Sequence, residues 1–349
     1  MPNRYDTDYK IGQDNIRTWG MDLHNPVFII SALLVLLFVI GTIMFPDGAK
    51  AAFDDSKAWS IDNFDWFFLV AGNIFVLFCL ALIALPIGRI RLGGVDASPE
   101  FSNLSWFAML FAAGMGIGLM FWSVAEPAAY YTDWWGTPLN VEPRTAAGAE
   151  LAMGATMFHW GLHPWAIYAV VALSLAFFTY NKNLPLTIRS AFFPFIKDRS
   201  WGWFGHVIDI VAVMATIFGL ATSLGFGAQQ AAGGMKYLFG IPNTVHVQIA
   251  IIIGVTAVAI VSVVRGLDGG VKLLSNINMV LALTLLLFVI VIGQGLGIFA
   301  GLLDTTAAYL KNLIPLSNWM NREDDKFYHG WTVFYWAWWI SWSPFVGMF

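Results

Sequence analysis

The chain has 349 residues, of which 58% are hydrophobic and only 11% are charged, and its formal net charge is −4. A soluble domain carries about 25% charged residues, so this composition excludes a single large soluble core and indicates a polytopic membrane protein. No basic block suggests a nucleic-acid partner. The single cysteine, Cys79, lies inside an apolar run, which excludes a disulfide framework and a thiolate metal site.

Eight segments are apolar over about the 20 residues that a membrane-spanning helix needs. We expect all of them to be α-helices, because the lipid core offers no partner for unpaired backbone groups. The predicted fold class is therefore an all-α polytopic membrane protein. The expected spans are 27–45, 64–87, 103–123, 149–180, 205–224, 245–263, 276–301 and 330–349.

The first 26 residues mix basic and acidic side chains, and no small-residue cleavage site follows the first apolar run. A signal peptide is therefore not expected. With the N-terminus inside, eleven of the 18 Lys and Arg residues fall on the inner side of the spans. The positive-inside rule thus predicts that residues 1–26 form a cytoplasmic segment.

Three glycines interrupt the third span, in the stretch AAGMGIGLMF at 112–121. Each costs roughly 1 kcal/mol in a helix interior relative to alanine, so together they weaken a continuous helix. Close helix packing through Gly114 and Gly118 is one explanation. The other is an unwound stretch facing a cavity, as in secondary transporters, and its candidate residues are Gly114, Met115, Gly116 and Gly118.

The fourth span carries Trp160, Trp165 and Tyr168 near its middle. Trp165 and Tyr168 are three residues apart and share one helix face. Membrane tryptophans usually form an interfacial belt, but the central position argues against that explanation here. Core packing remains the alternative to a binding site.

Several polar residues could form other sites. His159 and His163 are spaced i, i+4, which can bind a metal, but no cysteine or nearby carboxylate completes a site, so we expect a structural role and no transition metal. His206 and Asp209 are expected at a solvated helix end, with a proton relay as the alternative. Glu126 is expected to mark the outer boundary of the third span.

Residues 302–319 are too polar to cross the bilayer, and their apolar residues recur at helical spacing. This pattern predicts an amphipathic helix along the membrane surface, either as an ordinary loop helix or as a subunit contact. The last apolar run has no polar flank before Phe349. We therefore expect the chain to be an N-terminal fragment of a longer protein.

The stretch WTVFYWAWWISW, at 331–342, holds five tryptophans. Trp338 and Trp342 are four residues apart, and Trp339 and Trp342 are three apart, so together they form one aromatic face. An inward aromatic face with no carboxylate beside it suits a bulky, poorly hydrated cation. Quaternary ammonium groups donate no N–H hydrogen bond, and aromatic faces hold them with up to about 2 kcal/mol per desolvated contact.

At these residues the chain resembles the betaine/carnitine/choline transporter family, from about residue 25 to residue 349. The resemblance is densest at AAGMGIGLMFWSVAEP (112–127), MFHWGLHPWAIY (157–168), ATIFGLATSLGFG (215–227) and WTVFYWAWWISWSPFVGMF (331–349). It implies twelve transmembrane helices that include two inverted five-helix repeats. On that template 27–102 form two peripheral helices, 103–301 the first repeat, 302–329 the surface helix and outer loop, and 330–349 the first helix of a second repeat that is largely missing after Phe349.

The resemblance also implies which residues bind. The aromatic substrate box falls on Trp160, Trp165, Tyr168, Trp338, Trp339 and Trp342. The backbone carbonyls of Ala112 and Met115 would bind one sodium ion, and Thr216 with the carbonyl of Phe345 would bind a second. Leu220 offers no oxygen where a sodium-coupled relative has a second threonine, which puts the second ion site in doubt.

The expected function is a secondary active transporter that takes up quaternary-ammonium zwitterions such as glycine betaine by alternating access, with sodium as the coupling ion and no other cofactor. Gly118 favours a zwitterion, because choline-selective relatives often have an aspartate there. The alternative is proton-coupled or exchange transport of choline, carnitine or dimethylsulfoniopropionate; a histidine-metal membrane enzyme and a passive channel are rivals. The family also implies a homotrimer, in contact with lipid, in a bacterial inner membrane.

Overall fold

The structure is a computed structural model, and it describes residues 5, 7–114, 116–293 and 295–349. Most of the described chain is helical, which confirms the predicted all-α polytopic class. The longer helices are α1 (Val27–Met44), α2 (Pro46–Ala84), α3 (Asn103–Gly114), α4 (Ile117–Thr132), α5 (Ala146–Trp160), α6 (Leu162–Ala176), α9 (Trp203–Phe239), α10 (Val245–Val264), α11 (Lys272–Ile292), α12 (Leu296–Ser317) and α14 (Phe334–Met348).

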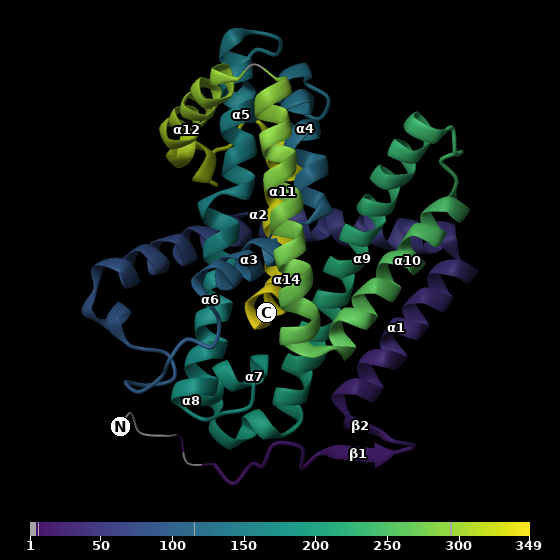
Figure 1. Cartoon of the computed structure of the whole chain (residues 1–349), viewed down its shortest axis with the longest axis vertical. Coiled ribbons are helices and arrows are strands. Elements are labelled where there is room, and N and C mark those ends of the chain that lie inside the picture. The colour runs from purple at the N-terminus through teal and green to yellow at the C-terminus, as the bar shows by residue number, and fades with distance from the viewer. Residues whose placement is uncertain (1–4, 6, 115, 294) are drawn as a thin grey trace.

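Shorter elements join these helices. They are β1 (Asn15–Thr18), β2 (Met21–His24), η1 (Pro86–Arg89), η2 (Pro138–Asn140), η3 (Phe177–Asn181), α7 (Ile188–Ala191), α8 (Phe193–Ile196), η4 (Lys197–Trp201), η5 (Leu267–Val271), α13 (Asp325–Phe327) and η6 (Tyr328–Val333). In Figure 1, α4, α5 and α12 lie together at one end, while α1, α9 and α10 lie together on one side. Helix α14 is central and packs against α2, α6 and α9.

The number of spans is smaller than the sequence predicted. Among the described residues, six helices are long and apolar enough to cross a membrane, and α3 with α4 makes a seventh if the bent pair is one span. The expected eighth span, 330–349, is not among them, although α13, η6 and α14 form one continuous helical run from Asp325 to Met348. The fourth span is divided at Gly161 into α5 and α6.

The end of the seventh span differs between the sequence prediction and the structure. We expected the seventh span to end at residue 301, but α11 ends at Ile292 and the next helix, α12, already begins at Leu296. The backbone between them includes Gly293 with extended angles and Gly295 with a φ of 54°. Glycine adopts these angles without the steric penalty that other residues carry, so the helix breaks here rather than where polarity rises.

The N-terminal segment forms a hairpin that the sequence analysis did not predict. Strands β1 and β2 pair antiparallel, and the two residues between them both have positive φ, as a two-residue hairpin turn requires. In Figure 1 the hairpin lies at the lower edge of the view, below α7. Arg189 of α7, which is 1% exposed, contacts this N-terminal segment. Its Nη2 donates to the hydroxyl of Tyr9 at 3.1 Å and lies 3.0 Å from Nε2 of His24.

The start of the fifth span differs from the prediction, which placed His206 and Asp209 at a solvated helix end. Asp209 and His206 are each 8% exposed, so they do not lie at a solvated helix end. Arg189 Nε is 3.1 Å from Asp209 Oδ2, and Arg189 Nη1 is 3.2 Å from His206 Nδ1. A buried carboxylate is tolerated here because a guanidinium neutralises it.

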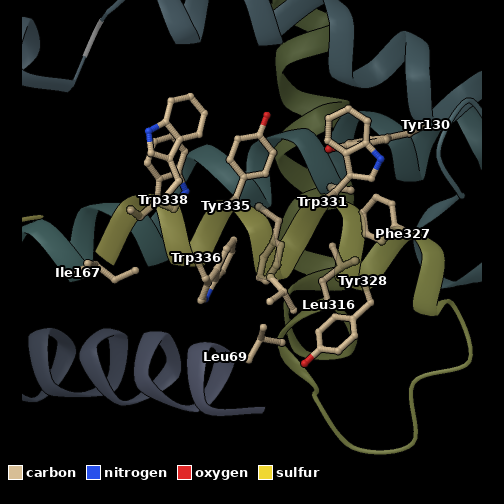
Figure 2. Close-up of a cluster of buried hydrophobic side chains, with 14 of the residues drawn as sticks. Leu69, Tyr130, Ile167, Leu316, Phe327, Tyr328, Trp331, Tyr335, Trp336 and Trp338 are labelled. Carbon is tan, nitrogen blue, oxygen red and sulfur yellow. The ribbon is translucent and has the colours of Figure 1, made fainter. Parts of the chain in front are cut away.

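The aromatic core lies around α14. Trp336 points toward α2 beside Leu69, whereas Tyr335 and Trp331 point to the opposite side with Tyr130 (Figure 2). Helix α2 can approach Trp336 closely because residue 72 is glycine, where an added Cβ atom would lie 2.4 Å from the indole Nε1. Packing of this kind replaces the hydrophobic driving force that is absent between helices in lipid.

We predict that Gly72→Val destabilises the protein by about 1–3 kcal/mol, because its side chain overlaps the fully buried Trp336. A lowered melting temperature of the purified protein in detergent would report this loss. Gly41→Val, at a helix position where no atom lies within 4 Å of an added Cβ, is the matched control. Equal melting temperatures for the two variants would contradict the prediction.

The docking of the N-terminal hairpin should depend on pH. Burial, and then the charge of Arg189, lower the pKa of His24 below its ordinary value. The released hairpin therefore binds a proton more readily than the docked one. Docking is complete above about pH 6.5, the ordinary histidine pKa, and weakens as the pH falls below it.

A spin label at Trp19→Cys, in a Cys79→Ser background, should measure this change because Trp19 is exposed on the hairpin. We expect greater label mobility at pH 5 than at pH 8. His24→Gln keeps an acceptor for Arg189 but does not titrate. The mobility of the label in this variant should therefore change less with pH. Of the two histidines that contact Arg189, this variant keeps only His206. Equal mobility at both pH values in the unaltered hairpin would refute the prediction.

Candidate functional site

The glycine stretch of the third span breaks the helix. Helix α3 ends at Gly114 and α4 begins at Ile117, and the axes of residues 103–114 and 118–132 differ by 56°. Gly116 has extended angles, with φ −103° and ψ −176°. Gly114 also serves close packing, because an added Cβ would lie 2.1 Å from Cη2 of Trp165. Met115 lies outside the described residues.

A small cavity opens at this break. Its volume is about 180 Å³, below the roughly 300–1,000 Å³ of pockets for drug-sized ligands, so it suits a small molecule. It lies between the broken span, α5, α6, α9 and α14. The residues that line it are Ala112, Ala113, Gly114, Gly116, Gly118, Leu119, Trp160, Tyr168, Ser223, Trp338, Trp339, Trp342, Phe345 and Phe349.

Five of the six predicted aromatic residues line this cavity, and Trp165 does not. Trp165 is 45% exposed. It covers Gly114 and meets Tyr168 edge to face with ring centroids 6.0 Å apart. The structure thus places Trp165 behind the cavity wall, where it fixes the end of α3.

The indoles of α14 form a continuous wall. Trp338 and Trp339 stack with ring centroids 4.9 Å apart and an interplanar angle of 14°. Trp160 meets Trp339 at 4.8 Å and 68°. The Nε1 of Trp339 donates to the backbone carbonyl of His159 at 3.0 Å, which anchors this ring. Trp342 packs on α9, where an added Cβ at Gly219 would lie 3.1 Å from its Cε3.

A carboxylate lies behind this wall, which corrects two predictions. We expected Glu126 at an outer helix boundary and an aromatic face with no carboxylate beside it. Instead α4 continues to Thr132, and Glu126 is fully buried inside it. Trp160 Nε1 donates to Glu126 Oε1 at 2.6 Å, and the hydroxyl of Tyr335 donates to the same oxygen.

The second carboxylate oxygen is equally occupied. The hydroxyl of Tyr130 donates to Glu126 Oε2 at 2.8 Å, and His159 Nδ1 lies 3.1 Å from the same oxygen. Glu126 therefore ties α4 to α5 and α14. Sequence reasoning missed this cluster, although an ionisable residue between apolar runs was a usable signal, because such residues are costly in a membrane and are often functional.

The histidine pair does not form a metal site. Gly161, which lies between them, has non-helical angles, so the i, i+4 helix geometry does not hold. His159 contacts Glu126, whereas His163 Nε2 is 2.9 Å from Asn73 Oδ1. Within the described part of the chain, no group of three or more His, Cys, Asp or Glu side chains could hold a metal ion.

The predicted ion-binding residues are only partly brought together. Ala112 and Phe345 line the cavity. Thr216 is on α9, one turn before Gly219 and so on the helix face that meets Trp342, but it is not a lining residue of the cavity. Both sodium sites therefore remain predictions.

The fold and the cavity define a polytopic membrane protein with a small aromatic-lined cavity at a broken helix. Residues 26–349 match the model of the betaine/carnitine/choline family transporters. The chain belongs to this family, which is a family of transporters and not of enzymes, as the sequence predicted.

Several relatives are similar over most of the chain. A glycine betaine transporter of Vibrio parahaemolyticus is 62% identical over 345 residues, which are 98% of this chain and 66% of the relative. A glycine betaine/proline/choline/ectoine transporter of the same organism is 58% identical over 346 residues, 98% of this chain and 61% of the relative. An osmo-dependent choline transporter of Acinetobacter baylyi is 38% identical, over 98% of this chain and 50% of the relative. The chain thus spans less than two thirds of these relatives.

Proposed function

We propose that the complete protein is a secondary active transporter that takes up quaternary-ammonium zwitterions such as glycine betaine, and that they bind in the aromatic cavity. The observation that carries this proposal is the small cavity walled by Trp160, Tyr168, Trp338, Trp339 and Trp342. The relatives, two of which are named as transporters of glycine betaine, support the same substrate class.

Aromatic faces suit a methylated ammonium group because it is large, weakly hydrated and unable to donate N–H hydrogen bonds. Each desolvated contact contributes up to about 2 kcal/mol. Two or three such contacts supply about 4–6 kcal/mol, which corresponds to dissociation constants from about 1 mM down to tens of micromolar. The cavity volume of about 180 Å³ leaves room for a compact head group and little more.

The broken helix provides a place for the carboxylate of a zwitterion. Gly116 and Gly118 line the cavity, and backbone amides at a helix break are free to donate to an anion. The lining residues include no acidic or basic side chain. The carboxylate of a zwitterion therefore meets backbone dipoles rather than a formal charge inside the cavity.

We further propose alternating access about the broken helix, with sodium as the coupling ion near Ala112 and Met115. Proton coupling or exchange is the alternative, and the buried Glu126–His159 contact favours it. The protein would act as a homotrimer in a bacterial inner membrane, with residues 1–26 in the cytoplasm. Uptake that is saturable but independent of sodium would replace the first coupling mode with the second.

We predict that Trp342→Leu in the full-length protein weakens glycine betaine binding about tenfold or more, because one desolvated aromatic contact is lost. Binding of glycine betaine, choline, carnitine and dimethylsulfoniopropionate, each with and without sodium, would be measured by calorimetry. Trp59→Leu, at an exposed tryptophan of α2, is the matched control. Unchanged affinity of the Trp342 variant would count against the aromatic site.

Substitutions of Gly118 by larger residues test the same cavity, because the added side chain would occupy part of its volume. An added Cβ would lie 3.6 Å from Cη2 of Trp338 and 3.7 Å from Cη2 of Trp160, which are ordinary contact distances. Gly118→Ala should therefore keep measurable binding of tetramethylammonium, whereas Gly118→Val should abolish it by occupying the cavity. The melting temperatures of both variants would show that they fold. Equal binding by both variants would mean that the ligand lies elsewhere.

A further inference from the structure

The buried cluster behind the cavity wall carries a formal charge. We infer that Glu126 is a specificity-determining residue, whose carboxylate charge acts through Trp160 and Tyr335 and makes the cavity prefer a positively charged head group over a neutral one of the same shape. This inference rests on the proposed function and assigns the selectivity of that site to a residue that does not line it.

The protonation state of the cluster follows from its hydrogen bonds. The hydroxyl of Thr332 is fully buried, and within the described structure its hydrogen-bond partner is His159 Nε2, at 3.0 Å. The hydroxyl proton therefore points to Nε2, because a buried donor without a partner costs about 1–3 kcal/mol. The imidazole is then neutral, with its proton on Nδ1, which lies 3.1 Å from Glu126 Oε2 and 3.0 Å from the hydroxyl oxygen of Tyr130.

With this tautomer, every polar neighbour of Glu126 is a donor. Two donors reach Oε1, from Trp160 and Tyr335, and two reach Oε2, from Tyr130 and His159. An ionised carboxylate accepts hydrogen bonds at both oxygens and donates none, so it matches this set. Among the described residues, no lysine or arginine forms an ion pair with Glu126, whose pairing partner is His159 Nδ1 at 3.1 Å. With the imidazole neutral, the cluster has a net charge of −1.

Trp160 connects this charge to the cavity. Its Nε1 donates to Glu126 Oε1 at 2.6 Å, while its Cη2, at the other end of the indole, lies against Gly118 in the cavity. A hydrogen bond to a carboxylate is charge-assisted and pushes electron density into the ring. The face of an indole that binds a cation electrostatically becomes more negative as a result.

Tyr335 extends the same effect along α14. Its hydroxyl donates to Glu126, and its ring stacks on Trp338 at 6.0 Å and 14° and on Trp339 at 5.4 Å and 21°. The carboxylate thus fixes one ring of the stacked wall. In the low dielectric of a buried site, its charge also acts directly on a ligand in the cavity.

A purely structural clamp is the competing role for Glu126, and it predicts a different result. Loss of a clamp loosens the wall and weakens all ligands alike. Loss of a charge weakens cationic ligands and leaves neutral ones unchanged. Choline and 3,3-dimethyl-1-butanol form a suitable pair, because they have nearly the same shape but a carbon atom replaces the charged nitrogen in the second.

The experiment measures the ratio of their dissociation constants in the full-length protein. Glu126→Gln keeps an oxygen that can accept from Trp160 and Tyr335 but removes the charge. We expect this variant to bind choline and glycine betaine about tenfold or more weakly, with little change for 3,3-dimethyl-1-butanol. An unchanged ratio of choline to neutral analogue, whether both weaken or neither does, would overturn the inference.

A second pair of variants tests the inference if Glu126→Gln does not fold. Glu126→Asp and Glu126→Asn have the same size and lose the same reach, but only the first keeps the charge. Glu126→Asp should retain the preference for choline over its neutral analogue, and Glu126→Asn should lose it; equal ratios would overturn the inference. If the unaltered protein bound no quaternary ammonium compound, the proposed function itself would fail, which is a distinct result.

Discussion

Large aromatic rings in this protein lie directly on glycines of neighbouring helices, and the site depends on that contact. Trp336 of α14 packs against Gly72, Trp342 of α14 against Gly219, and Trp165 of α6 packs on Gly114. In lipid, helices gain little from hydrophobic burial against each other, so close packing of this kind holds them together. The same contacts that hold α14 in the centre also set the positions of the cavity walls.

The buried carboxylate shows how this packing tolerates a charge. An unpaired carboxylate in a membrane protein would be costly, but four hydrogen-bond donors from three helices surround Glu126. Two of these donors, Trp160 and Tyr335, belong to the aromatic wall or stack on it. The same hydrogen bonds therefore stabilise the buried carboxylate and hold two rings at the wall.

Much of this site could be predicted from local sequence spacing. The i, i+4 spacing of Trp338 and Trp342 and the clustered glycines at 114–118 each lie within a few neighbouring residues, where a local pattern is informative. Glu126 could not be assigned in this way, because its partners come from positions up to 209 residues away. The N-terminal hairpin was missed for the same reason, since Arg189 holds it through contacts across the chain.

The helix break divides the third span into a part that the hydrogen bonds of Glu126 hold and a part that they do not. Glu126 follows Gly116 by ten residues, about 15 Å along α4, and its hydrogen bonds fix α4 to α5 and α14. Helix α3, on the other side of the break, packs against α11, and its end at Gly114 contacts Trp165 of α6. In the alternating access proposed above, a change of angle at Gly116 would displace α3 while the carboxylate cluster and the wall of α14 stay together. Such a motion would open or close the cavity along the edge formed by Ala112, Ala113 and Gly114.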